Sequence, residues 1–95
     1  MALYLVSYDI DAKDKDEYEG LWAELRNMNA TRILYSEWLI AAGVNEAVAI
    51  YDSLTPHIRQ DDRLLVQEVC GQAAWDKLMI TDDAFRKILI SNTRR

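Results

Sequence analysis

The order in which two periodicities alternate along the chain is the strongest constraint on its fold. Along residues 2–8, side chains of two groups alternate, and most of these residues favour β-strands. This pattern predicts a strand that ends at Asp9. Between residues 15 and 28 the apolar residues instead recur every three or four positions, which is typical of one face of an amphipathic helix. The period therefore changes from that of a strand to that of a helix directly after Asp9.

The middle of the chain is predicted to form two strands joined by a turn. Residues 30–42 are too rich in β-formers for a helix and too many for one ordinary strand. We therefore expect strands at about 31–35 and 37–42, with a tight turn near Ser36. The competing interpretation is a single long bent strand. Gly43 ends the segment.

A second helix and a fourth strand complete the pattern. Asn45 is placed to cap a helix that ends near Leu54, because Pro56 disfavours its continuation. One further turn over residues 57–60 is the alternative. Residues 63–69 are predicted to form the fourth strand. The order β-α-β-β-α-β predicts an α+β fold of the ferredoxin-like type, formed by residues 1–69.

Residues 70–95 exceed what this fold requires and are predicted to form an extension of the same single domain. The 95 residues have room for one modest core and no second one. Thr81 or Asp82 can cap a short final helix. The apolar residues of that helix would share one face: Phe85, Ile88 and Leu89. We expect the extension to pack over the sheet or onto a second subunit.

The charge of the chain argues against a general nucleic-acid binder. The formal net charge is −5 at pH 7, whereas such proteins usually present a basic field to phosphates. Residues 1–30 hold seven acids and three bases, and residues 86–95 hold four bases and no acid. The acidic amino-terminal segment and the basic carboxyl-terminal segment can form complementary surfaces between subunits. For most of these residues, ordinary solvated surface charge is the simpler interpretation.

The remaining composition predicts a reduced, cytoplasmic protein outside the membrane. No apolar run approaches the ~18 residues of a membrane span. The first residues lack the basic region, apolar stretch and cleavage site of a secretory signal. Cys70 is the single cysteine, which excludes an internal disulfide, and we expect it to be a buried structural thiol.

Familiar catalytic and metal-binding motifs are absent from the sequence. A calcium loop counted from Asp9 fails, because its fifth position is Lys13 and its twelfth is Gly20. There is no glycine-rich phosphate loop, no nucleophile elbow and no zinc-type spacing of Cys and His. His57, the sole histidine, is expected to be a polar surface residue in a turn. Trp22 is expected to pack in the core.

Asp9 is the candidate functional residue, and two roles are open to it. Asp often starts a loop by accepting hydrogen bonds from nearby backbone amides. Its carboxylate is also a hard oxygen ligand that suits Mg²⁺ or Mn²⁺. One carboxylate makes a weak site, but in a symmetric dimer the same residue can supply two across the two-fold axis. A cation held there could polarise a phosphodiester and activate water.

Three segments of the chain resemble a known family. The first strand ends in Tyr-Asp-Ile at residues 8–10, residues 32–38 read Arg-Ile-Leu-Tyr-Ser-Glu-Trp, and residues 62–66 form an acidic entry into the last strand. This pattern resembles the small CRISPR-associated adaptation protein Cas-two, whose fold family includes VapD-type toxin ribonucleases. The resemblance covers roughly residues 3–69.

The resemblance implies a homodimer whose two sheets face each other. It implies that Asp9 of each subunit would act as catalytic residue and hold a divalent metal, Mg²⁺ or Mn²⁺, at the two-fold axis. By matching position, Ser36 would lie near Asp9, while Tyr8 and Arg32 would flank the site. In CRISPR adaptation the family's dimer serves mainly as a scaffold for DNA beside an integrase, so an integrase-type or other protein partner is also implied.

Departures from the family pattern weaken DNA bridging in particular. The family often has Lys and Arg after the aspartate, whereas residues 9–17 here hold five acids and two bases. Leu34 replaces a glutamine of the second-strand motif, and Glu37 replaces an apolar residue. These changes favour a solitary or toxin-like relative over an integrase partner.

Three functions from different classes follow from the sequence. The first is binding or metal-dependent cleavage of RNA or DNA, with Asp9 as the ligand. The second is a non-catalytic dimeric scaffold or interaction module, whose acidic surface binds a basic protein. The third is a dimer that binds a small ligand, which a closed apolar pocket between the sheet and the helices would favour.

Overall fold

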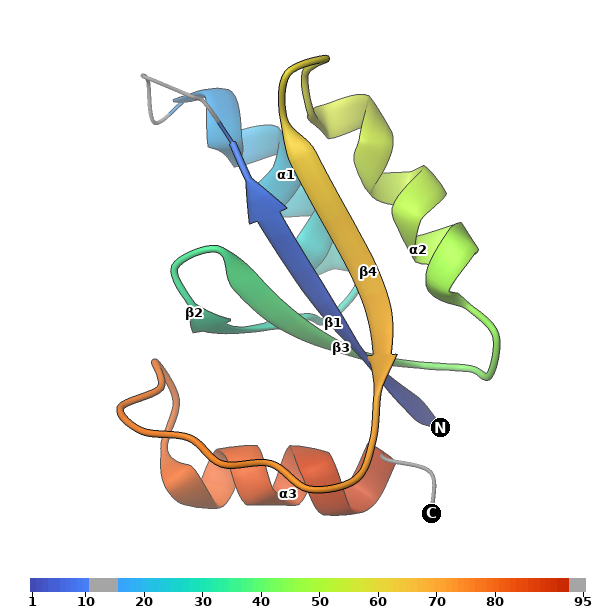
Figure 1. Ribbon diagram of the computed structural model, residues 1–95. Helices are drawn as coiled ribbons and strands as arrows, with labels where there is room; N and C mark the ends of the chain where they lie inside the picture. The colour runs from blue at the N-terminus through green and yellow to red at the C-terminus, as the bar shows by residue number, and fades with distance from the viewer. Residues whose placement is uncertain (11–15, 93–95) are drawn as a thin grey trace.

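The elements of the computed structural model, which describes residues 1–10 and 16–92, follow the predicted order (Figure 1). They are β1 (Ala2–Asp9), α1 (Asp16–Asn27), β2 (Thr31–Leu34), β3 (Glu37–Ala42), α2 (Ala47–Leu54), the 3₁₀ turn η1 (Thr55–His57), β4 (Arg63–Val69) and α3 (Asp82–Asn92). The α+β, ferredoxin-like arrangement with an extension that carries a short helix is confirmed. Two strands joined by a turn are also confirmed, so the alternative of one long bent strand is wrong.

The four strands form one antiparallel sheet in the order β2-β3-β1-β4. β1 lies in the middle, where it pairs with β3 on one side and β4 on the other. Ser7 lies opposite Glu37, and Asp9 lies opposite Arg63. The carboxyl end of β1 therefore meets the amino end of β4, and this junction places Asp9.

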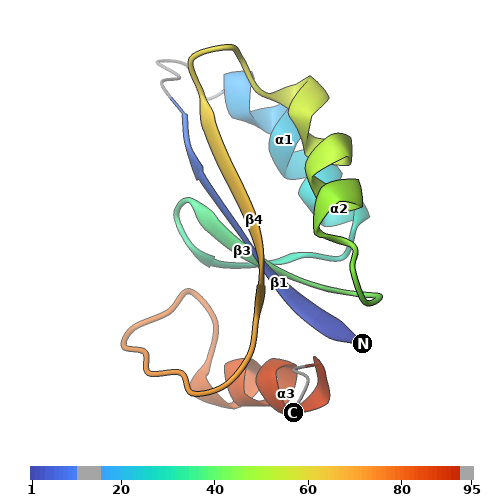
Figure 2. The same cartoon turned by 45° about the vertical axis from the view of Figure 1, so that its right-hand side comes forward.

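Helices α1 and α2 cover one face of the sheet (Figures 1 and 2). Because side chains alternate along a strand, the even-numbered residues of β1 point toward these helices. The larger core cluster lies in this layer and is formed by Ala2, Tyr4, Val6, Tyr8, Leu21, Leu25, Trp38, Ile40, Ile50 and Leu54. The odd-numbered residues of β1, including Asp9, belong to the opposite face.

The extension packs on that opposite face and forms a second, smaller core (Figure 2). Phe85 of α3 is buried against Leu3, Ile33 and Leu39 of the sheet. Trp75 meets the Phe85 ring edge to face, with 4.6 Å between ring centroids. The Thr81 hydroxyl accepts a hydrogen bond from the Ala84 amide at 3.1 Å, which confirms that Thr81 caps the last helix.

The extension also reaches the outer edge of the sheet. The backbone N–H of Met79 donates to the carbonyl of Ile33 in β2, at a distance of 2.9 Å. β2 is an edge strand of four residues with a register irregularity between Arg32 and Leu34. The extension therefore satisfies part of an edge that would otherwise face solvent.

Asn45 does not cap the second helix, contrary to the prediction. Its backbone φ is 63°, in the left-handed region that Asn tolerates well, so it forms a turn before the helix. The residue at the cap position is Glu46, whose side chain makes no capping hydrogen bond. The Tyr4 hydroxyl instead accepts from the Glu46 N–H at 2.9 Å and donates to the Gly43 carbonyl at 2.7 Å. A residue distant in sequence thus replaces the local cap.

Three further predictions about local structure are either corrected by the structure or concern side chains outside the described ones. Cys70 is exposed, contrary to the prediction of a buried thiol, because it lies just beyond the end of β4, where the chain leaves the sheet. Beyond α2 the chain forms the 3₁₀ turn η1 around Pro56 in place of a further helical turn at 57–60. The sequence also suggests a capping box for α1, because Asp14 and Glu17 have the spacing of N-cap and N3, but these side chains lie outside the described ones.

Among residues 1–10 and 16–92, no helix is both long enough and apolar enough to cross a membrane.

Candidate functional site at the end of β1

Asp9 is the last residue of β1 and its carboxylate faces solvent. The side chain is 75% exposed, and its Oδ2 lies 3.6 Å from Nη1 of Arg63, whose side chain is 83% exposed. An ion pair between two exposed groups contributes only about 0–1 kcal/mol, since water screens both charges. The Asp9 carboxylate is therefore held weakly and is accessible to a ligand.

Two surface hollows adjoin Asp9. One has a volume of about 210 Å³ and is lined in part by Ser7, Asp9 and Leu65. The other has a volume of about 320 Å³ and is lined by Asp9, Ile10, Asp61 and Arg63. The second hollow brings a second carboxylate, Asp61, to the candidate site.

Sequence reasoning did not single out Asp61 as a partner of Asp9. Fifty-two positions separate the two residues, and only the antiparallel pairing of β1 with β4 brings them to one hollow. The signal that could have found the pair is the position of Asp61 just before the predicted fourth strand. That inference needed the strand order, which the residue pattern alone does not supply.

Ser36, in the turn between β2 and β3, lies beside the end of β1. The Tyr8 N–H donates to the Ser36 carbonyl at 3.1 Å, which ties the β2–β3 turn to β1. The side chain of Tyr8, however, belongs to the helix-covered face. The sheet therefore separates the Tyr8 hydroxyl from the Asp9 carboxylate.

Tyr8 and Arg32 act together to hold the turn that contains Ser36. The Tyr8 hydroxyl accepts hydrogen bonds from the indole N–H groups of Trp22 at 3.0 Å and Trp38 at 3.2 Å, and donates to the Tyr35 carbonyl at 3.2 Å. Arg32 Nε donates to the same carbonyl at 3.1 Å, and its guanidinium lies 4.8 Å from the Trp22 ring centroid. These contacts position the turn beside Asp9.

One chain assembles only part of a metal site from its described residues. Among them, no three His, Cys, Asp or Glu side chains are grouped closely enough to hold a metal ion. Asp9 and Asp61 share a hollow, and carboxylate oxygens are the donors that Mg²⁺ and Mn²⁺ prefer. The carboxylate oxygens of these two residues fit such a cation, but they are too few to complete its coordination. The remaining ligands would have to come from outside the described residues of one chain.

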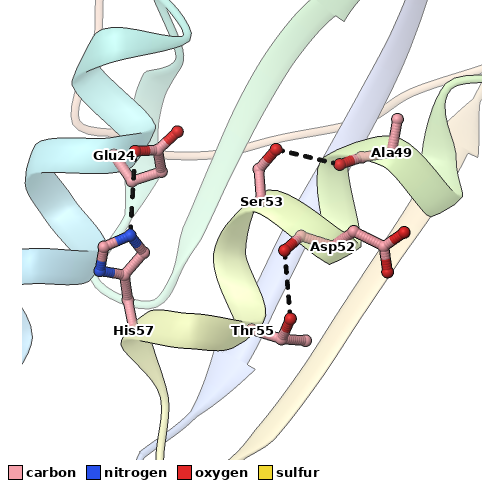
Figure 3. Close-up of polar contacts among 6 residues, drawn as sticks. All are labelled: Glu24, Ala49, Asp52, Ser53, Thr55 and His57. Atoms are coloured by element: carbon pink, nitrogen blue, oxygen red, sulfur yellow. Dashed lines mark hydrogen bonds and ion pairs between the residues drawn. The ribbon is translucent and has the colours of Figure 1, made fainter.

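His57 pairs with an acid that sequence reasoning did not place beside it (Figure 3). Its Nε2 lies 3.8 Å from Oε2 of Glu24, and the two side chains are 34% and 29% exposed. Gly20 makes room for the ring, because a Cβ on Gly20 would lie only 3.2 Å from His57 Nδ1. The contact joins η1 to α1, and the hydrogen bonds in Figure 3 from Ser53 to Ala49 and from Thr55 to Asp52 close the end of α2.

Comparison with known proteins adds evidence on the fold. No protein-family model matches the chain. Among solved structures it is similar to a hypothetical protein, TT1823, from Thermus thermophilus, with a TM-score of 0.66. The likeness covers 83% of this chain and 95% of that one at 20% sequence identity. At this identity the likeness shows the fold alone.

Proposed function

We propose that the protein is a homodimer, related to the Cas-two and VapD proteins, that binds and cleaves nucleic-acid phosphodiesters with the help of Mg²⁺ or Mn²⁺. The observation that supports this most is the position of Asp9. Its exposed carboxylate ends the central strand, on the sheet face opposite α1 and α2. A two-fold axis near that strand end would bring the same carboxylate from two chains together.

The sheet face around Asp9 offers room for a second copy. The extension covers the part of this face around Leu3 and Leu39, both of which are buried. At the other end, Leu65 is 50% exposed and lines the hollow that also contains Ser7 and Asp9. An apolar side chain beside an accessible carboxylate is a surface that a second copy could bury.

The residues of the site have distinct roles in this proposal. Asp9 of each chain would bind the cation, and Asp61 would bind it or hold a water molecule beside it. Arg63 would turn from Asp9 toward a phosphate oxygen, since its guanidinium is exposed and only weakly paired. The bound cation would polarise the phosphodiester and lower the pKa of the attacking water.

The first prediction is that replacing Asp9 abolishes cleavage without unfolding the protein. Asp9→Asn keeps the size of the side chain but removes the charge that binds the cation, so we expect a loss of activity of at least ~100-fold. The measurement is cleavage of labelled single-stranded RNA and DNA with Mg²⁺ or Mn²⁺. Asp61→Asn should weaken metal dependence, while Asp52→Asn, on an exposed position of α2, is the matched control.

Two results would contradict the proposal in different ways. If the wild-type protein cleaves neither RNA nor DNA with either metal across pH, the enzymatic part fails and the non-catalytic scaffold remains. A structure of the dimer tests the geometry separately. Two carboxylates that bridge one cation through bonds of ~2.1–2.5 Å must bring their oxygens within about 5 Å of each other.

A further inference from the structure

A second site, away from Asp9, lies between the sheet and the extension. It is a pocket of about 480 Å³. Its floor is formed by Leu5, Ile33 and Leu39 of the sheet, and one wall by Phe85 and Leu89 of α3. Pockets that bind small molecules in proteins commonly have volumes of roughly 300–1,000 Å³ and mainly apolar linings. The size and lining of this pocket fall in that class.

The polar groups of the pocket gather along one side, where the chain leaves β4. Residues 70–73 line this side, together with Gln67. Gly71 has a φ of 86°, and a Cβ built on it would meet no atom within 4 Å. The segment therefore borders open space, and the pocket has a mouth beside backbone and amide groups that can form hydrogen bonds.

No charged side chain points into the pocket from the described residues that line it. Lys, Arg and His are absent from this lining, and its single acidic residue is Glu68. Glu68 pairs with Tyr4 of β1, whose side chain packs against the helices, so alternation directs the Glu68 side chain to that face as well. An ionised ligand would lose its hydration here without gaining a partner.

We propose that this pocket binds an uncharged, mainly apolar small molecule that carries a hydrogen-bonding group at one end. The apolar body would lie against Leu5, Leu39 and Phe85, and the polar end would face residues 70–73. This inference concerns a surface separate from Asp9 and does not depend on nucleic-acid cleavage.

The test uses two fluorescent probes with the same aromatic skeleton. N-phenyl-1-naphthylamine is uncharged, and 1-anilinonaphthalene-8-sulfonate adds one negative charge. We expect the uncharged probe to bind saturably at one molecule per chain and the sulfonate to bind at least ~10-fold more weakly. Ala73→Phe, which fills the mouth of the pocket from an exposed position, should weaken binding of the uncharged probe at least ~10-fold.

Three controls locate the probe and separate this proposal from the previous one. Ala74→Phe adds the same ring at the next exposed position, which does not line the pocket, and should bind like the wild type. The bound probe should slow alkylation of Cys70, the only thiol, which lines the mouth. Asp9→Asn should leave probe binding unchanged.

Several outcomes would overturn the inference. Binding that does not saturate, binding that Ala73→Phe leaves intact, or equal affinity for the two probes would each contradict a site for an uncharged ligand. If Ala73→Phe instead changes the sedimentation of the protein and leaves probe binding unaltered, the pocket belongs to a contact between copies of the chain.

Discussion

At the scale of single residues, the Tyr8 hydroxyl joins more of the molecule than any motif in the sequence suggests. It bonds two indoles, from α1 and β3, and the carbonyl of the turn between β2 and β3. The alternation of residues 2–8 places Tyr8 on the same side of the strand as Tyr4 and Val6, and all three are buried in the structure. It does not predict these partners, because they come from segments 14 to 30 positions away.

We predict that Tyr8→Phe destabilises the protein by about 2 kcal/mol. The substitution keeps the ring but removes the acceptor of the Trp22 and Trp38 N–H groups, and an unsatisfied buried group costs about 1–3 kcal/mol. The Tyr35 carbonyl loses this donor but keeps Arg32. Urea unfolding measures the change. Tyr51→Phe, at a ring that is 44% exposed, is the control and should shift stability by less than ~0.5 kcal/mol. Equal stability of the two variants would contradict the assigned role of Tyr8.

Asp9 and Asp61 show which part of the candidate site can be predicted from the sequence and which part cannot. The end of a strand pattern is visible in the sequence, so the exposed position of Asp9 could be predicted. The partner carboxylate could not, because it depends on which strands are neighbours. The Glu24–His57 pair could not be predicted from the sequence either, because it depends on how η1 packs on α1.

At the scale of elements, the strands were predicted more accurately than the start of the second helix. The predicted fourth strand at residues 63–69 has the same bounds in the structure. A strand's period of two is a local property of the sequence, whereas the start of α2 depends on a tertiary contact. The hydroxyl of Tyr4 caps that helix from β1, and no local pattern around Asn45 reports it.

We predict that Tyr4→Phe costs about 1 kcal/mol or more, because it removes the acceptor of the Glu46 N–H and the donor to the Gly43 carbonyl. The companion variant is Asn45→Gly, which should retain stability or gain slightly, since Gly adopts a φ of 63° without strain. Both changes are measured by thermal and urea unfolding. If Asn45→Gly proved the more harmful of the two, the local cap expected from the sequence would be correct after all.

At the scale of the whole molecule, two apolar layers share one sheet. Helices α1 and α2 cover one face, and the extension covers part of the other. The residue pattern indicated that residues 70–95 needed cover but left open whether the sheet or a second subunit supplied it. The buried contacts of Phe85 with Leu3, Ile33 and Leu39 show that the chain's own sheet does so.

We predict that Phe85→Ala lowers the free energy of unfolding by about 3 kcal/mol, because the truncated ring leaves a cavity in the smaller core. A domain of this size has only about 5–15 kcal/mol of stability in total, so the loss should be plain in urea unfolding. Ile90→Ala, on the same helix at a side chain that is 68% exposed, should change little. A loss below ~1 kcal/mol for Phe85→Ala would mean that the extension is loosely attached to the sheet.

The hydrogen bond from Met79 to Ile33 affects how copies of this chain can meet. A sheet with two free edges can recruit strands on both sides and grow without limit, which is the route to fibres. Here the extension occupies part of the β2 edge, and among the described residues β4 pairs with no strand other than β1. Growth by strand addition is therefore favoured in one direction only. Two molecules that join through their β4 edges leave no equally open edge behind, so such an assembly terminates at a pair.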